Sequence, residues 1–310
     1  MRHIWACAPT RRPRRCIESL DASAILISME ISSLGEFMAR HAKLFVLTGA
    51  GCSTDSGIPD YRDASGSWKR SPPVTFQAFM GSAAMRQRYW ARSLIGWERF
   101  RQAVPNQAHE ALARLERQGR LSILVTQNVD GLHQAAGSLE VIDLHGRLDQ
   151  VRCMDCETLT SREELQMELL RVNAAWGRLE GELAPDGDAD LNALPFGEFE
   201  VPTCARCGGV LKPNVVFFGE SVPHSRVEAA MQGLARADAV LVIGSSLMLY
   251  SGYRFVQAAT ELGKPVAAVN VGLTRADELL TLKVSEPCAQ ALAALSLPLE
   301  ESSGLVYADR

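Results

Sequence analysis

The 310-residue chain contains no apolar stretch of about 20 residues, the length that a helix needs to cross a bilayer. It has no excess of positive charge, since its formal net charge is −4, and it therefore offers nucleic acid no general attraction. Repeated units and extended low-complexity tracts are also absent, which argues against a solenoid or scaffold. We therefore expect a globular protein with no membrane partner and no nucleic-acid partner.

The N-terminus lacks the apolar core of a secretion signal, although arginines occur at positions 2, 11, 12, 14 and 15 with no acidic residue before Glu18. We interpret residues 1–29 as a basic tail that is disordered or that results from a start codon placed too early, with Met29 and Met38 as later starts. A short organellar targeting segment is the alternative. The expected compartment is the cytoplasm, or the mitochondrial matrix if that segment is a transit peptide.

Four of the eight cysteines form two CxxC motifs, Cys153 with Cys156 and Cys204 with Cys207. Four thiolates in two knuckles are the number and type of ligand that a tetrahedral structural zinc requires. The 47 residues between the pairs exceed the usual zinc-ribbon spacing, so the spacing leaves open whether both pairs hold one ion. Two disulfides or free thiols are the alternative. We expect one Zn²⁺ that stabilises a small domain, because no open coordination position for water is evident.

Buried strands are indicated by five apolar runs, which suit a parallel sheet covered on both faces. They are residues 44–47, 121–125, 215–218, 240–243 and 266–269. A helix that Asn106 caps and Gly119 ends, with an apolar stripe at Ala108, Leu112 and Leu115, lies before the second run. Another helix is expected at about residues 226–235. The alternation predicts an α/β fold with a Rossmann-like parallel sheet.

Two insertions interrupt this pattern. Residues 63–104 contain seven aromatic residues and are expected to form a helical module beside the glycine-rich loop that follows the first strand run. Most of these aromatics are core residues, and Trp68 and Phe76 are candidates for lining an acyl tunnel. Residues 150–212 hold the paired cysteines and form the small zinc-binding domain. The Rossmann-like domain then comprises residues 30–149, with the helical module, and residues 213–300.

A glycine-rich loop follows the first strand run, in the sequence GAGCSTDSGIPDYR from Gly49 to Arg62. We expect Gly49, Gly51 and Gly57 to permit positive φ angles and to let backbone N–H groups approach a pyrophosphate. The dehydrogenase fingerprint GxGxxG would place a glycine where this chain has Thr54, which disfavours a hydride-transfer enzyme.

Further polar groups follow the other strand runs. TQNVDGLH spans Thr126 to His133, LHG spans Leu144 to Gly146, and GSS spans Gly244 to Ser246. In an α/β fold, side chains at the carboxyl ends of the strands face the ligand. His145 is placed there, and an imidazole with an ordinary pKa of about 6.5 suits proton transfer near neutral pH. His133 is the competing histidine.

Taken together, the glycine-rich loop, TQNVDGLH, LHG, the CxxC pairs and GSS resemble the sirtuin family, over about residues 38–295. PDYRD followed by SGSWKR, the long insertion between cysteine pairs and GSSLMLYSGYRF resemble its class II, the branch with lipoamidase-type members. The resemblance implies an NAD-dependent protein-lysine deacylase. NAD is consumed as co-substrate, and acyl-lysine proteins are the expected partners.

The resemblance also implies site residues. Catalysis is assigned to His145 as general base, with Asn128 and Asp130. The cofactor pocket is assigned to Gly49, Ala50, Gly51, Ser53, Asp60, Tyr61, Arg62, Gln127, Asn128, Val129, Asp130, Gly244, Ser245, Ser246, Asn270, Val271, Gly272 and Cys288. Val215 and Phe217, in the segment KPNVVFFGE, are expected to contact the acyl-lysine substrate.

The implied reaction moves the acyl group from lysine to ADP-ribose and releases nicotinamide. Two other functions fit the same pocket: a protein mono-ADP-ribosyltransferase, and a noncatalytic module that senses NAD or ADP-ribose. Acetyl, lipoyl and longer branched acyl groups are all compatible with the sequence.

Overall fold

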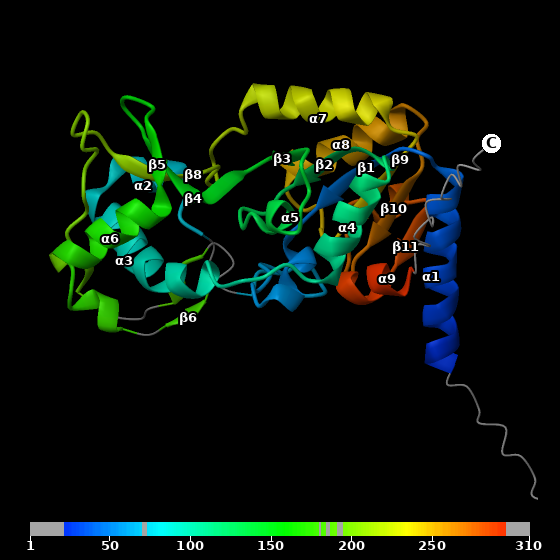
Figure 1. The fold of residues 1–310 in the computed structure, drawn as a ribbon, viewed down its shortest axis with the longest axis horizontal. Coiled ribbons are helices and arrows are strands. Elements are labelled where there is room, and N and C mark those ends of the chain that lie inside the picture. The colour runs from blue at the N-terminus through cyan, green and yellow to red at the C-terminus, as the bar shows by residue number, and fades with distance from the viewer. Residues whose placement is uncertain (1–21, 70–72, 180, 184–186, 191–194, 296–310) are drawn as a thin grey trace, which may run out of the picture.

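A computed structural model describes residues 22–69, 73–179, 181–183, 187–190 and 195–295. The elements form two parts, one built on a parallel sheet and one on a small antiparallel sheet with helices (Figure 1). The chain passes from the first part to the second and back twice, first through residues 76–100 and then through residues 146–215. Residues 1–21 of the predicted basic tail lie outside the described residues.

Six parallel strands form the large sheet, in the order β11-β10-β9-β1-β2-β3. Their bounds are β1 (Leu44–Thr48), β2 (Leu121–Thr126), β3 (Val141–Asp143), β9 (Ala239–Ile243), β10 (Val266–Val269) and β11 (Leu282–Val284). Every residue of β1, β9 and β10 is buried, as expected for strands that are covered on both faces. The prediction of a Rossmann-like α/β fold is therefore confirmed.

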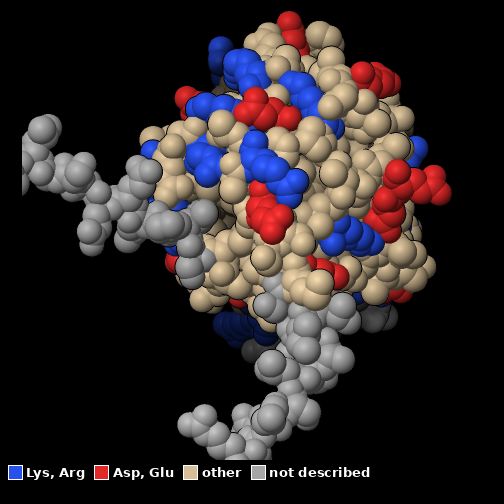
Figure 2. All heavy atoms as spheres, turned by 90° about the vertical axis from the view of Figure 1, so that its right-hand side faces the viewer, with Lys and Arg blue, Asp and Glu red and all other residues tan. Residues whose placement is uncertain are grey.

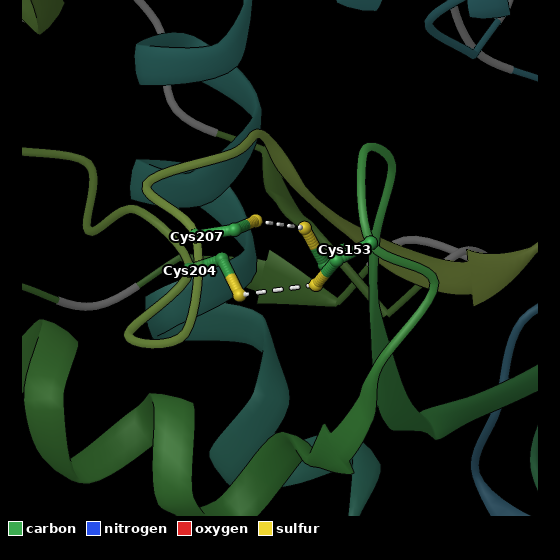
Figure 3. Close-up of side chains that lie close together, drawn as sticks. Cys153, Cys204 and Cys207 are labelled. Atoms are coloured by element: carbon green, nitrogen blue, oxygen red, sulfur yellow. Dashed lines mark hydrogen bonds between the residues drawn. The ribbon is translucent and has the colours of Figure 1, made fainter.

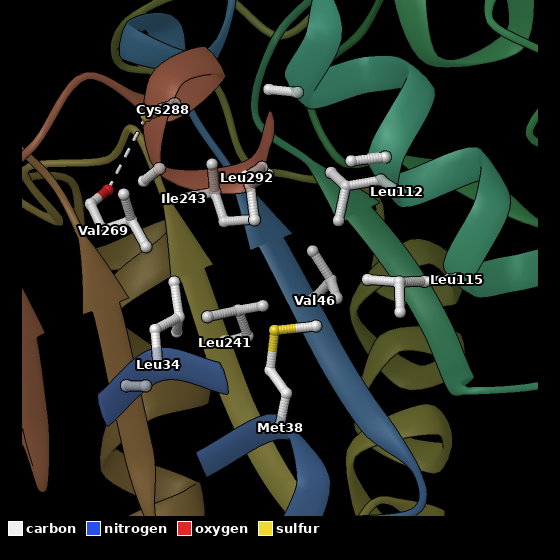
Figure 4. Close-up of a cluster of buried hydrophobic side chains, with 14 of the residues drawn as sticks. Leu34, Met38, Val46, Leu112, Leu115, Leu241, Ile243, Val269, Cys288 and Leu292 are labelled. Atoms are coloured by element: carbon white, nitrogen blue, oxygen red, sulfur yellow. Dashed lines mark hydrogen bonds between the residues drawn. The ribbon is translucent and has the colours of Figure 1, made fainter. Parts of the chain in front are cut away.

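Helices cover both faces of this sheet. On one face lie α1 (Ala22–Arg40), α4 (Gln107–Arg117) and α9 (Cys288–Ala294), and their apolar side chains pack on β1, β9 and β10 (Figure 4). The other face is covered by α7 (His224–Arg236) and α8 (Tyr250–Glu261). A single-turn helix, α5 (Leu132–Ala135), follows β2.

The helix predicted after Asn106 is present as α4 and begins as expected. The Asn106 side chain accepts a hydrogen bond from Ala108 N–H, and His109 Nδ1 accepts one from Asn106 N–H, which completes a capping box. Gly119 takes a positive φ of 69° just after the helix. The second predicted helix is present as α7.

The small module contains the antiparallel sheet β5-β4-β8 and the helices that pack against it. Its elements are β4 (Gly146–Cys153), β5 (Leu159–Ser161), β8 (Leu211–Val215), α2 (Phe76–Gly81), α3 (Ala83–Phe100), α6 (Arg162–Val172) and the hairpin β6 (Glu182–Leu183) with β7 (Ala189–Asp190). Five 3₁₀ turns complete the described elements: η1 (Ala50–Cys52), η2 (Thr54–Ser56), η3 (Trp176–Arg178), η4 (Phe196–Glu198) and η5 (Asp277–Leu279).

The structure corrects three boundaries of the predicted organisation. The run 215–218 is not a strand of the parallel sheet, because β8 ends at Val215 and pairs antiparallel with β4. The predicted boundaries of the zinc-binding domain, at residues 150 and 212, fall inside β4 and β8, and the pairing of these two strands holds the small module together. The tail does not extend to residue 29, because α1 begins at Ala22.

Helices α2 and α3 of the insertion 63–104 pack with the zinc-binding module and not with the large sheet, contrary to the predicted domain division. Phe79, Trp90 and Leu94 share one buried core with Val151 of β4 and Leu169 of α6. The aromatic side chains of α3 are therefore mostly core residues, as expected. They bury their surface against the small sheet because the faces of the large sheet are already covered.

The face of the molecule drawn in Figure 2 carries Lys and Arg side chains interspersed with Asp and Glu. No surface of one sign dominates this face. Among the described residues, no helix is both long enough and apolar enough to cross a membrane.

Candidate active site

One cavity of ≈950 Å³ lies between the carboxyl edge of the large sheet and the small module. Its volume is at the upper end of the range of about 300–1,000 Å³ for small-molecule sites. Residues that directly follow β1, β2, β9 and β10 line it, beginning at Gly49, Gln127, Gly244 and Asn270. Every residue that we assigned to catalysis, cofactor or substrate lines this one cavity.

The glycines of the first loop act differently from our expectation. Gly49 has an extended backbone, with φ −139° and ψ −172°, and Gly57, at φ 85°, is the one of the three with a positive φ. Gly49 and Gly51 leave room for the Gly244 carbonyl oxygen. A Cβ on Gly49 would lie 2.8 Å from this oxygen, and a Cβ on Gly51 would lie 3.1 Å from it. These glycines let two cavity loops pack together, and the packing sets the floor of the cavity.

Ser53 joins the polar residues that follow β1 and β2. Its hydroxyl donates to Asp130 Oδ2 at 2.7 Å and accepts from Asn128 Nδ2 at 3.0 Å. Asn128 Nδ2 also donates to the Gly49 carbonyl at 3.0 Å, and Asp130 Oδ1 accepts from Leu132 N–H at 2.9 Å. The three side chains therefore form one network that is held by the backbone of both loops.

His145 lies between β3 and β4, and its two ring nitrogens have different partners. Nδ1 lies 2.8 Å from the Gln127 carbonyl oxygen, and Nε2 lies 2.9 Å from Ser251 Oγ. Because a carbonyl only accepts, Nδ1 carries the proton, and Nε2 of the neutral ring is the acceptor. Burial, together with the nearby charges of Arg226 and Arg254, lowers the pKa of His145 to about 4, although the Gln127 carbonyl raises it. The ring is neutral near pH 7.

His133 is excluded as the competing base by its surroundings. The side chain is 1% exposed, does not line the cavity and forms a hydrogen bond through Nε2 to Thr48 Oγ1 at 2.9 Å. Burial lowers the pKa of His133 to about 3. With Cys52 and His109 it forms a buried group of side chains under the first loop. His133 therefore supports the loop, as predicted.

The segment after the first loop also lines the cavity. Arg62 lies 4.0 Å from the Trp68 ring in a cation–π contact, and its Nη1 donates to the Gly66 carbonyl at 2.7 Å. Asp60 forms an ion pair with Lys69. Tyr61 and Trp68 lie edge to face. Trp68 lines the cavity, whereas Phe76 packs in the core of the small module and does not.

The remaining cofactor candidates come from the carboxyl ends of β9 and β10. Ser245 Oγ accepts from Gln127 Nε2 at 2.7 Å, which ties the third loop to the second. Asn270 Nδ2 donates to the Gly272 carbonyl at 3.0 Å, and Val271 is 60% exposed beside them. Ser246 lines the same stretch of the cavity.

Cys288 lines the cavity at the start of α9, but most of its surface is buried. Its thiol donates to the Val269 carbonyl at 3.8 Å, and burial raises the pKa of the thiol to about 12. The residue therefore offers the cavity a neutral thiol and packs in the core under β10.

An apolar wall closes the end of the cavity next to the small module. Val215 and Phe217, the residues expected to contact the acyl-lysine substrate, belong to it. Ile58, Phe100 and Leu148 complete the wall and form one buried cluster, which Val215 extends. These three are not among the predicted site residues, because isolated apolar residues have no local signature that separates a cavity wall from a core.

The four paired cysteines form one site (Figure 3). Cys153 Sγ lies 3.5 Å from Cys207 Sγ, and Cys156 Sγ lies 3.8 Å from Cys204 Sγ. Zinc–sulfur bonds of about 2.3 Å in a tetrahedron place sulfur atoms about 3.8 Å apart, so the four thiols fit one Zn²⁺. All four cysteines are free of disulfides, and none of them lines the cavity. A bound zinc would therefore hold the small module together and not meet the substrate.

Comparison with known protein families gives one match to this chain. The model of the Sir2 family matches residues 49–251. The matched segment begins at the first cavity loop and ends at Ser251.

Curated relatives are similar over most of the chain. A protein of Xanthomonas axonopodis pv. citri (strain 306), named NAD-dependent protein deacetylase, is 66% identical over 86% of this chain and 91% of its own length. NAD-dependent protein deacetylase 2 of Bradyrhizobium diazoefficiens is 64% identical over 85% of this chain and 96% of its own length.

Solved structures have the same fold. One described as "Sir2-p53 peptide-NAD+" has a TM-score of 0.70 and 30% identity, over 86% of this chain and 97% of that chain. A Sir2 homologue in complex with ADP-ribose has a TM-score of 0.68 and 31% identity, over 85% of this chain and 94% of that chain.

Proposed function

Because this chain belongs to the Sir2 family, we propose that it is an NAD-dependent protein-lysine deacylase that transfers an acyl group from lysine to ADP-ribose and releases nicotinamide. The observation that carries the proposal is the position of His145. A neutral imidazole, with Nε2 as a proton acceptor, lines the same cavity as the Ser53, Asn128 and Asp130 network.

The residues that line the cavity fit NAD. Backbone loops after four parallel strands provide polar groups at the carboxyl edge of the sheet, where α/β folds bind nucleotides. Asn128 and Asp130 would hold ribose hydroxyls, and Ser245, Ser246 and Asn270 would hold the adenosine half. When bound, NAD supplies the ribose carbon that accepts the acyl oxygen, and nicotinamide is the leaving group.

His145 acts as the general base in this proposal. Gln127 fixes the tautomer by accepting from Nδ1, so Nε2 can take a proton from a ribose hydroxyl. The lowered pKa of about 4 keeps the ring unprotonated at physiological pH. Asn128 and Asp130 position the sugar beside it.

The apolar wall supports a neutral acyl group as substrate. Ile58, Phe100, Leu148 and Val215 present hydrocarbon to the end of the cavity. Arg92, on the neighbouring helix, is directed away and donates to the Ala189 carbonyl at 2.8 Å. We assign the chain to the class II, lipoamidase-type branch, with acetyl, lipoyl and branched acyl-lysine proteins as substrates. The cytoplasm is the proposed compartment, since the relatives are bacterial proteins.

The experiment that tests this function measures nicotinamide release from NAD with acetyl-, lipoyl- and branched-acyl-lysine peptides. Wild type should release nicotinamide only with an acyl peptide and should yield O-acyl-ADP-ribose. His145→Ala should lose about 10²–10⁴-fold in rate, the size of a general-base contribution. His224→Ala is the matched control, because this histidine is 92% exposed on α7 and should keep the wild-type rate.

The products separate the competing functions. ADP-ribose attached to protein would identify a mono-ADP-ribosyltransferase. Tight binding of NAD without nicotinamide release would identify a sensing module. An unchanged rate in His145→Ala would refute the assignment of the base.

A further inference from the structure

The hydroxyl of Ser251 is the nearest side-chain neighbour of the base atom that we assign. Ser251 Oγ lies 2.9 Å from His145 Nε2, although 106 residues separate the two in the chain. Because Nδ1 holds the proton that the Gln127 carbonyl accepts, Nε2 of the neutral ring can only accept. The Ser251 hydroxyl therefore donates to Nε2.

The start of α8 packs against Gln127, the residue whose carbonyl also accepts from His145 Nδ1. Ser251 is the second residue of α8, and Gly252 follows it. A Cβ on Gly252 would lie 2.5 Å from Gln127 Oε1, so the glycine lets this helix approach the loop after β2. Gln127 thus contacts the ring through its carbonyl and the start of α8 through its side chain.

We propose that Ser251 is a positioning residue for His145: its hydroxyl holds Nε2 toward the cavity as a hydrogen-bond acceptor and gives up that acceptor to a ribose hydroxyl when the co-substrate binds. This role rests on the proposed function. Nothing else in the described structure contacts Nε2 by a hydrogen bond, and Ser251 itself lines the cavity.

Burial and two nearby arginines disfavour the charged form of the His145 ring. Arg226 of α7 and Arg254 of α8 repel an imidazolium, whereas the Gln127 carbonyl favours it. A hydroxyl that donates to Nε2 stabilises the neutral ring, so its removal raises the pKa of His145. One lost hydrogen bond corresponds to a rise of about half to one pH unit.

Ser251→Ala tests the role. We expect the acid limb of kcat/KM to move to higher pH by about half to one unit, and kcat to fall about three- to tenfold, the size of one lost hydrogen bond. The KM for NAD should stay within about twofold, since the donors that hold the sugar remain. Ser251→Thr restores the hydroxyl and should restore both the profile and kcat.

Thr260→Ala is the matched control, because it removes a hydroxyl from the same helix that bonds only to the Val256 carbonyl at 3.0 Å. An NMR titration of ¹³C-labelled histidine without substrate provides a readout that does not depend on activity. The signal of His145 is assigned by its absence in His145→Gln. It should titrate at higher pH in Ser251→Ala and at the wild-type pH in Thr260→Ala.

The outcomes are distinct. An unchanged His145 titration and pH profile in Ser251→Ala would overturn the proposal, as would a Ser251→Thr variant that behaves like Ser251→Ala. If wild type released no nicotinamide but Ser251→Ala still shifted the His145 titration, the contact would stand and the deacylase function would fail.

Discussion

Gly244 lies where two backbone loops of the site approach each other closely. It has a positive φ of 62°, and a Cβ there would lie 2.2 Å from the backbone nitrogen of Cys52. Two requirements therefore act on one position: a left-handed conformation and the close approach of two loops. The sequence shows such a glycine only as part of GSS, and its neighbour across the cavity cannot be read from that motif.

Gly244→Ala should separate the two loops and weaken NAD binding. We expect a loss of at least about 3 kcal/mol in unfolding free energy, since backbone has to move and left-handed strain of about 1–2 kcal/mol is added. Thermal unfolding with and without ADP-ribose measures both effects.

Gly263→Ala is the control that measures the cost of a left-handed backbone without the cost of separating two loops. Gly263 also has a positive φ, 67°, but no atom lies within 4 Å of its Cβ position. The Gly263→Ala variant should lose only about 1–2 kcal/mol of unfolding free energy, and ADP-ribose should stabilise it as much as it stabilises wild type. Equal losses in the two variants would show that loop packing is not the cause.

At the scale of elements, the local patterns predicted most of the large sheet correctly. Leu44–Leu47 and Val266–Val269 are buried runs bounded by polar loops, and both form strands. The run Val215–Phe218 has the same local character but lies beside β4. Local apolarity reports burial, and it does not identify the strand that becomes the neighbour.

The small module should depend on zinc as one unit. Cys204→Ala removes one of four thiolates, and apparent zinc binding contributes about 10–16 kcal/mol in comparable sites. Bound zinc should fall from about one ion per chain to nearly none. Hydrogen exchange should rise in β4, β8, α3 and α6, whereas β1 and β9 should keep their protection.

Cys52→Ala is the control for this experiment, because Cys52 lies under the first loop and outside the zinc cluster. It should retain one zinc per chain. A Cys204→Ala protein that keeps its zinc would contradict the four-cysteine site. Equal gains of exchange in both sheets would contradict the placement of α3 in the small module.

At the scale of the whole molecule, the cavity exists only because the two parts meet. The large sheet contributes the polar loops, and the small module contributes Phe100, Leu148 and Val215 of the apolar wall. Polar chemistry and hydrocarbon therefore occupy opposite sides of one cavity. A nucleotide and an acyl chain can then be held next to each other at His145.

Stability should fall as the pH is lowered from about 6.5 toward 4, because burial lowers the pKa of His133 to about 3 and of His145 to about 4. In this window His133 and His145 bind protons in the unfolded chain but stay neutral in the folded protein. The unfolding free energy therefore decreases with decreasing pH. Each ring contributes about 1.4 kcal/mol per pH unit to the slope of unfolding free energy against pH. Urea unfolding at pH 7, 6 and 5 measures the slope.

His133→Gln should make this slope shallower by the contribution of one ring. His224→Gln, at an exposed position, should leave the slope as in wild type. Parallel slopes in all three proteins would show that the buried histidine is not the cause.

The sequence by itself determined the types of chemistry: four thiolates in two knuckles, polar groups at strand ends, and buried runs for a parallel sheet. These features are local, because spacing and periodicity express backbone geometry and ligand number. Only the tertiary structure decided that α3 joins the zinc module, that Gly49 is needed for contact with Gly244, and that Ser251 meets His145. Such pairings depend on which surfaces are left to be buried after the sheet has formed, and no short segment carries that information.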